Sequence, residues 1–128
     1  MIDHVSIGVS DLRASARFYD EILAPLLYRR LVDTPSRVAF GTKYPEIWPN
    51  FRPKMAAVDA DAGSHICLRS RSCDAIDAFH AIATANGGRD DGRPGLRQAT
   101  MVEYYAAFVR DLDGHRIEVM TVPEPTNQ

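Results

Sequence analysis

The alternation of apolar and polar positions predicts a strand, a helix and three further strands over the first 51 residues. Residues 5–9 alternate between apolar side chains and small or polar ones, which is the pattern of a half-buried strand. Ser10–Asp11 then provides a helix N-cap, and apolar residues follow at helical spacing until Pro25 ends the helix. The three short strands are expected over residues 26–32, 36–42 and 46–51.

The second half of the chain repeats this order from residue 64 onward. Residues 64–69 alternate as a strand, Ser72 is placed to cap a second helix, and Asn86–Gly88 provides the C-terminal stop of that helix. The remaining residues predict a loop rich in glycine and proline and then a closing hairpin, over residues 92–100, 104–109 and 115–120.

Two pairs of residues keep one spacing between the halves, which indicates a duplicated unit. His4 and His65 are 61 residues apart, and so are Phe18 and Phe79. The chain is therefore expected to form a single α+β domain over residues 1–128. Two tandem βαβββ modules would form a curved mixed sheet around a cavity, with the helices outside. The expected parts are module 1 (about 1–53), a linker (54–63) and module 2 (about 64–122).

The composition excludes several classes of partner. The formal net charge is -2 and no basic face is visible, which excludes nucleic acid as an expected partner. The apolar runs are too short to cross a membrane, and the N-terminal residues lack a signal pattern. Two cysteines fit a reducing compartment better than a disulfide framework. We therefore expect a cytoplasmic protein with a small-molecule substrate.

Three metal-ligand residue types share one predicted strand face. Strand parity places His4, His65 and Glu118 on the face opposite the helices, where they would line the cavity. Two imidazoles and one carboxylate suit a single divalent ion of Fe, Mn, Ni or Zn, and leave open coordination positions for a substrate. Two alternatives stay open, because strand histidines are more often core or surface residues, and Glu118 can instead pair with Arg116 or face solvent.

Three segments resemble the vicinal oxygen chelate superfamily, namely residues 2–5, 65–68 and 108–118, although Leu112 stands where that family usually has proline. This superfamily includes glyoxalase I, extradiol dioxygenases, fosfomycin-modifying thiol transferases and bleomycin-binding resistance proteins, and the resemblance covers about residues 2–120. It implies paired βαβββ modules, a homodimer, and a metal that acts as a Lewis acid on a substrate with vicinal oxygens.

The resemblance also assigns the metal ligands residue by residue. It gives His4, His65 and Glu118 as ligands, and it places the fourth ligand position of the family on Trp48. Glyoxalase I has glutamate there, and because indole cannot bind a metal, Trp48 argues against strict glyoxalase I chemistry. Glu46 would replace the missing carboxylate only if the strand register slipped. The three-ligand pattern is similar to that of the dioxygenases and thiol transferases.

The function prediction has two alternatives. The first is a small metal-dependent enzyme of lyase, isomerase or dioxygenase type. The second is a non-catalytic small-molecule-binding protein of the bleomycin-resistance kind, so its assignment as an enzyme stays open. The candidate catalytic residues are Glu118 and Tyr104, the latter as a proton donor, and the candidate substrate-binding residues are Trp48, Arg97 and Phe108. Packing roles for Tyr104 and Trp48, and a solvated Arg97, are the alternatives.

Overall fold

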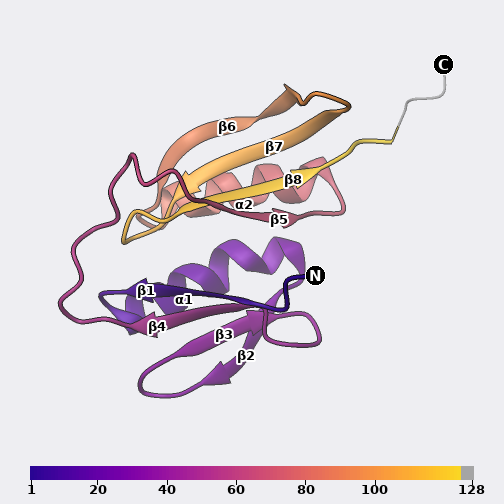
Figure 1. The fold of residues 1–128 in the computed structure, drawn as a ribbon. Coiled ribbons are helices and arrows are strands. Elements are labelled where there is room, and N and C mark those ends of the chain that lie inside the picture. Colours follow the sequence, from indigo (N-terminus) through magenta and orange to yellow (C-terminus); the bar gives the residue numbers. More distant parts are fainter. Residues whose placement is uncertain (125–128) are drawn as a thin grey trace.

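A computed structural model describes residues 1–124 of the chain. Each half has the predicted βαβββ order (Figure 1). No helix in this described part is long and apolar enough to cross a membrane. The first half contains β1 (Val5–Val9), α1 (Leu12–Leu23), a 3-10 turn η1 (Ala24–Leu26), β2 (Arg29–Asp33), β3 (Val38–Gly41) and β4 (Ile47–Phe51). The second contains β5 (Ile66–Arg69), α2 (Cys73–Ala85), β6 (Arg89–Gln98), β7 (Glu103–Arg110) and β8 (Arg116–Thr121).

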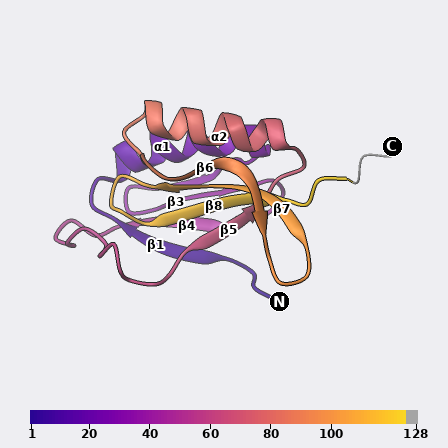
Figure 2. The same ribbon diagram turned by 90° about the horizontal axis from the view of Figure 1, so that it is seen from above.

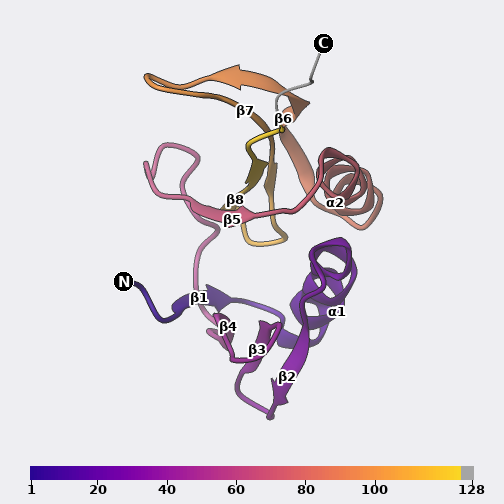
Figure 3. The ribbon, with the colours of Figure 1, turned by 90° about the vertical axis from the view of Figure 1, so that its right-hand side faces the viewer.

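The strands form two four-stranded mixed sheets with the same topology. The strand orders are β1-β4-β3-β2 and β5-β8-β7-β6, with β1 parallel to β4 and β5 parallel to β8. Both helices lie on the same side of the molecule and pack against each other, which leaves the opposite sheet faces uncovered by helices (Figure 3). The predicted α+β fold of tandem modules is confirmed, with two open sheets rather than one continuous sheet.

Both helices begin at the residues whose side chains cap them. Asp11 accepts a hydrogen bond from the backbone N–H of Ala14, and Ser72 accepts one from Ala75. These bonds satisfy N–H groups that have no partner within the helix. The sequence located both helix starts because a cap is a local feature.

The predicted loop over residues 92–100 is wrong in large part, because β6 occupies residues 89–98. This strand lies at the outer edge of its sheet and forms a long hairpin with β7 (Figure 1). An edge strand tolerates Pro94, because one of its sides needs no backbone N–H donor. The register shifts on both sides of Gly92, whose φ of +157° suits glycine. The glycines and proline therefore mark bulges in a strand and not a loop.

The core lies between the helices and the apolar faces of the strands. The helix residues Phe18 and Phe79, which are 61 positions apart, are both buried, although Phe18 was expected on the flank of its helix. The alternation is confirmed in both modules, since the apolar strand positions face this core: Ile7, Val9, Leu68, Ile117 and Val119 are buried in it, and Val5 and Ile66 pack against it.

The turn between β7 and β8 links the two modules through hydrogen bonds. Asp111 accepts a hydrogen bond from the buried Tyr19 hydroxyl of α1, and Asp113 accepts from the backbone N–H and the hydroxyl of Ser10. His115 Nε2 lies 2.7 Å from the carbonyl oxygen of Gly8 at the end of β1. These contacts hold the end of β1 beside the start of β8, and so they set the relative position of the two sheets.

Candidate functional site

Glu118 lies at the centre of the helix-free face of the second sheet. The strand register places Cys67 of β5 on one side of it and Phe108 of β7 on the other. The side chain of Glu118 is only 8% exposed, and its Oε1 lies 3.0 Å from Nε2 of His65. Burial, and then the adjacent Glu118 carboxylate, raise the pKa of the Cys67 thiol to about 12. The structure thus brings two of the three predicted metal ligands into direct contact.

A cationic aromatic cluster adjoins this pair. The guanidinium groups of Arg97 and Arg116 lie 5.1 and 4.0 Å from the centre of the Phe108 ring, within cation–π range. Nε of Arg97 is buried and has no hydrogen-bond partner among residues 1–124. Arg116 pairs with Asp91 at 2.8 Å, so the alternative pairing of Arg116 with Glu118 is not formed. Arg97 therefore lies over Phe108, which is the ladder neighbour of Glu118.

His4 lies on the other sheet and does not join His65. Its side chain is 51% exposed, pairs with Asp3 and contacts Trp48 edge-on at 6.3 Å between ring centres. Strands β1 and β5 run in opposite directions (Figures 1 and 2), and the contact of His115 with Gly8 places the start of β5 at the end of β1. His4 precedes β1 and pairs with Asp3, whereas His65 lies near the Gly8 end of that strand and pairs with Glu118, so the two imidazoles do not share a partner.

The donor chemistry fits a divalent metal, but one chain supplies an incomplete set. Neutral imidazole nitrogen and carboxylate oxygen are the preferred ligands of Zn, Fe, Mn and Ni, and His65 and Glu118 already converge on one point. Within residues 1–124 no group of three or more His, Cys, Asp or Glu side chains is arranged to hold an ion. A third protein ligand would have to come from outside this arrangement.

Trp48 occupies its predicted place on the first sheet. It pairs with Ser6 of β1 across the ladder, so the strand register has not slipped. Glu46, the alternative ligand, accepts instead from the Tyr28 hydroxyl, and burial together with this bond raises the pKa of Tyr28. Trp48 lines an open groove of about 510 Å³ with His4 and Arg37. The helix-free face of the first sheet therefore presents an aromatic platform where the second sheet has Glu118.

Tyr104 lies on the same strand face as Phe108 but farther along β7. The two residues are four positions apart, or about 13 Å along an extended strand. Tyr104 pairs with Arg97 in the ladder between β6 and β7. The strand register therefore places Tyr104 next to Arg97, on the strand face that carries Phe108.

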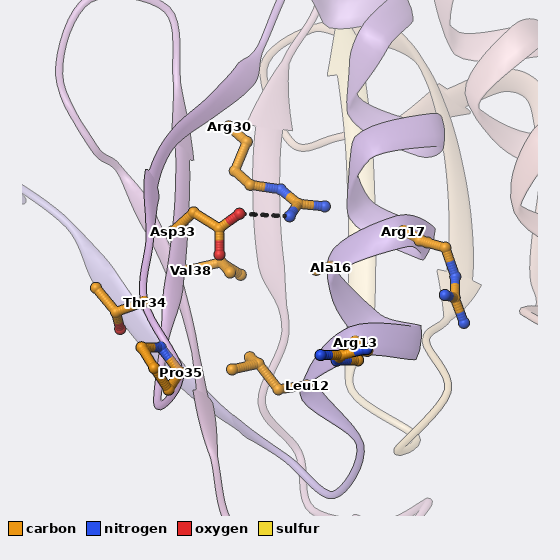
Figure 4. A pocket seen from close by; sticks show the side chains of 9 residues that line it. All are labelled: Leu12, Arg13, Ala16, Arg17, Arg30, Asp33, Thr34, Pro35 and Val38. Atoms are coloured by element: carbon orange, nitrogen blue, oxygen red, sulfur yellow. Dashed lines mark hydrogen bonds and ion pairs between the residues drawn. The ribbon is translucent and has the colours of Figure 1, made fainter.

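Two further hollows adjoin the modules. A crevice of about 370 Å³ separates β1 from β5, and His65, His115 and Arg116 lie along it. A pocket of about 450 Å³ lies between α1 and β2 on the helix side, and Arg30 inside it is paired with Asp20 and Asp33 (Figure 4). None of the predicted site residues lines this second pocket.

Sequence reasoning missed two arginines at the site. Arg37 lies over the Trp48 ring at 5.5 Å, and Arg116 lies over Phe108. For Arg116 the signal was available, because strand parity puts it on the face of Glu118. Arg37 precedes β3, and an isolated backbone bridge to Asn50 brings it next to Trp48. No local sequence pattern predicts this bridge.

Comparison with known proteins establishes the family. The model of the Glyoxalase/Bleomycin resistance protein/Dioxygenase superfamily matches residues 1–119, so the chain belongs to this superfamily. A glyoxalase/bleomycin resistance protein from Albidiferax ferrireducens is 31% identical, with a TM-score of 0.81 over 91% of this chain and 95% of that one. No curated protein sequence matches.

More distant solved structures share the fold alone. A glyoxalase/bleomycin resistance protein/dioxygenase family enzyme from Burkholderia phytofirmans has a TM-score of 0.72 at 16% identity, with coverage of 95% of this chain and 98% of that one. A mutant of the fosfomycin resistance protein FosX from Listeria monocytogenes, solved with Mn(II) and a dihydroxypropylphosphonic acid, has a TM-score of 0.69 at 16% identity. It covers 94% of this chain and 89% of its own.

Proposed function

We propose that the protein is a homodimer that uses one divalent metal per site to act on a small substrate with vicinal oxygens. The observation that carries this proposal is the contact between His65 and Glu118 on an open sheet face in a member of this superfamily. Because His4 is exposed and pairs with Asp3 instead of joining the His65–Glu118 pair of its own chain, the third ligand is His4 of a second chain. A two-fold dimer would then contain two equivalent sites.

Each candidate residue has a role in such a site. Glu118 and His65 hold the metal together with His4 of the second chain, and the metal when bound supplies Lewis-acid stabilisation of a developing oxyanion. The buried Glu118 carboxylate, with lone pairs left over, is also positioned to accept a substrate proton. Arg97, Phe108 and Trp48 bind the substrate, and Tyr104, the ladder partner of Arg97, donates a proton to the part of the substrate that extends along β7 past Arg97. We infer lyase, isomerase or dioxygenase chemistry, in a cytoplasmic protein whose two cysteines are free.

Elemental analysis of the untagged protein tests the metal site. We expect about one equivalent of Fe, Mn, Ni or Zn per chain, and loss of most of it in His4→Ala, His65→Ala and Glu118→Gln with the fold retained. His80→Ala is the matched control, because His80 of α2 pairs with Asp90 of β6 and not with a site residue, and this variant should keep its full metal content. Full stoichiometry in all three site variants would rule out this ligand set.

Mixed dimers test whether the site forms between two chains. Neither His4→Ala nor His65→Ala protein alone has a complete site. A dimer of one chain of each kind contains one complete site, because its His4 and its His65–Glu118 pair come from different chains. Co-refolding the two variants should therefore restore about a quarter of the wild-type metal in a random mixture. No recovery would show that the ligands come from one chain.

The alternative function is non-catalytic binding of a small molecule. The replacement of the family's fourth ligand by Trp48 favours it, because an aromatic platform binds ligands without a metal. A protein that binds no ion after reconstitution with each of the four metals, but still binds a ligand on its open faces, would establish this alternative.

A further inference from the structure

The helix-free face of the first sheet carries a groove that contains an aromatic side chain and positive charge. Trp48 lines it together with residues at the start of β1, just before β3 and at the end of β4. Six of its lining residues matter for the argument: His4, Ser6, Arg37, Trp48, Asn50 and Arg52. The groove opens to solvent and lies on the opposite side of the sheet from α1, so the core packing does not use it.

The groove is cationic even though the chain as a whole is slightly acidic. No aspartate or glutamate lines it, while Arg37 and Arg52 both do. Neither guanidinium has an acidic partner within 4 Å among residues 1–124, unlike Arg30, Arg110 and Arg116, which are all paired with aspartates. The acid nearest in sequence, Asp3, is already paired with His4. The Arg37 guanidinium beside the indole and the Arg52 guanidinium, four residues after Trp48 in the same groove, therefore present unused donors.

The positions of these groups define what can bind. The Arg37 guanidinium lies 5.5 Å from the centre of the Trp48 ring and makes no side-chain hydrogen bond to any described residue. A flat aromatic ring can therefore displace the Arg37 guanidinium from the face of the indole. The displaced guanidinium would stay within reach of a charged substituent on that ring. The stem of Arg52 is fixed more tightly, because it packs across Gly8, where an added Cβ would lie 3.1 Å from it. Ser6 is left as an exposed hydroxyl for a second polar group.

We propose that the Trp48 groove binds a planar aromatic carboxylate, stacked on the indole with its carboxylate paired to Arg37 and Arg52. This inference rests on the proposed function, since it names the class of small molecule that the His4 side of the site takes. Stacking on Trp48 selects a flat ring, and two cations without acidic partners select a negative charge. A neutral ring loses the ion pairs, and an aliphatic acid loses the stacking.

The only tryptophan in the sequence gives a direct readout of this binding. In metal-stripped protein, 2-naphthoate should shift the single indole N–H resonance in a ¹H–¹⁵N spectrum in a saturable way. The neutral 2-naphthylmethanol and the non-aromatic cyclohexanecarboxylate should each bind at least about tenfold more weakly. Equal binding of either comparison compound would overturn the proposal, as would the absence of any shift with 2-naphthoate.

Matched variants locate the contacts. Arg37→Gln and Arg52→Gln, at two exposed surface positions, should each weaken 2-naphthoate binding about tenfold, whereas Arg29→Gln, at an exposed position on β2, should leave it unchanged. Trp48→Ala, followed by ligand-detected NMR and checked for folding by its melting temperature, should abolish binding. If both arginine variants bind like the wild type, the ion-pair assignment is wrong.

The two proposals fail in different measurements. Naphthoate binding is measured without metal, and metal content is measured without naphthoate. A protein that holds one metal per site but does not bind 2-naphthoate overturns the groove assignment alone. A protein that binds 2-naphthoate but takes up no metal supports the groove and overturns the metal-dependent function.

Discussion

Three carboxyl groups are buried among residues 1–124, and their partners give them different roles. Asp111 accepts from the Tyr19 hydroxyl and two backbone N–H groups, and Asp113 accepts from Ser10. Both therefore use much of their acceptor capacity to join the modules. Among residues 1–124 the polar partners of the Glu118 carboxylate are His65 and Cys67, which leaves lone pairs free. A buried carboxylate with unused acceptors on an open face is the one of the three suited to a ligand.

The pH dependence of stability should report on Asp111. Burial raises its pKa above the usual 3.8, although the hydrogen bond from Tyr19 opposes this. The folded chain then binds this proton more tightly than the unfolded chain. The resulting stability is complete below the unfolded pKa and is lost as the pH rises through the folded pKa.

Comparison with Asp111→Asn isolates this effect, because the other carboxyl groups titrate alike in both proteins. The free energy of unfolding of the wild type minus that of the variant should fall as the pH rises from about 3. It should become constant once Asp111 is ionised in both states. Urea unfolding at a series of pH values gives this difference, and an increase with pH would contradict the assignment.

At the scale of elements, the sequence predicted the helices and strands that depend on neighbouring residues in the chain. It did not predict the strand that forms only by pairing with a distant segment. Caps at Asp11 and Ser72 and the alternation in β1 and β8 depend on neighbours in the chain, and all were predicted correctly. Strand β6 was missed because Gly92 and Pro94 are typical of loops. Only its pairing with β7, through two register shifts, makes that segment a strand.

The turn between β3 and β4 should tolerate no side chain at Gly41. A Cβ added there would lie 1.8 Å from the carbonyl oxygen of Tyr44, which is backbone and cannot rotate away. We expect Gly41→Ala to destabilise the protein by about 3 kcal/mol in urea unfolding. Gly95→Ala is the control, because a Cβ there meets nothing within 4 Å, and its change should stay within about 0.5 kcal/mol. Similar effects of both substitutions would show that the turn relaxes.

At the scale of the whole molecule, the duplicated sequence predicted the fold and the faces but not the distances between modules. Strand parity correctly put His4, His65, Trp48 and Glu118 on faces without helices. It contains no information on the direction of β1 relative to β5. These strands run in opposite directions (Figure 1), so residues that precede each of them, such as His4 and His65, lie toward opposite ends of the strand pair. The sequence thus predicted which side chains face the site, and only the packing of the modules shows which of them meet.

That packing should make the two modules unfold as one unit. The Asp113 carboxylate in module 2 receives the backbone N–H and hydroxyl of Ser10 in module 1, so its loss removes a buried junction contact. Asp113→Ala should lower the free energy of unfolding by about 1–3 kcal/mol. Trp48 lies in module 1, so its fluorescence should report this change in module 2, with the same midpoint as far-ultraviolet circular dichroism. Asp77→Asn, at an exposed α2 residue bonded to Tyr105 of the same module, should change the midpoint little. If Asp113→Ala shifts the circular dichroism transition but leaves that of Trp48 in place, the modules are independent and the β7–β8 turn does not couple them.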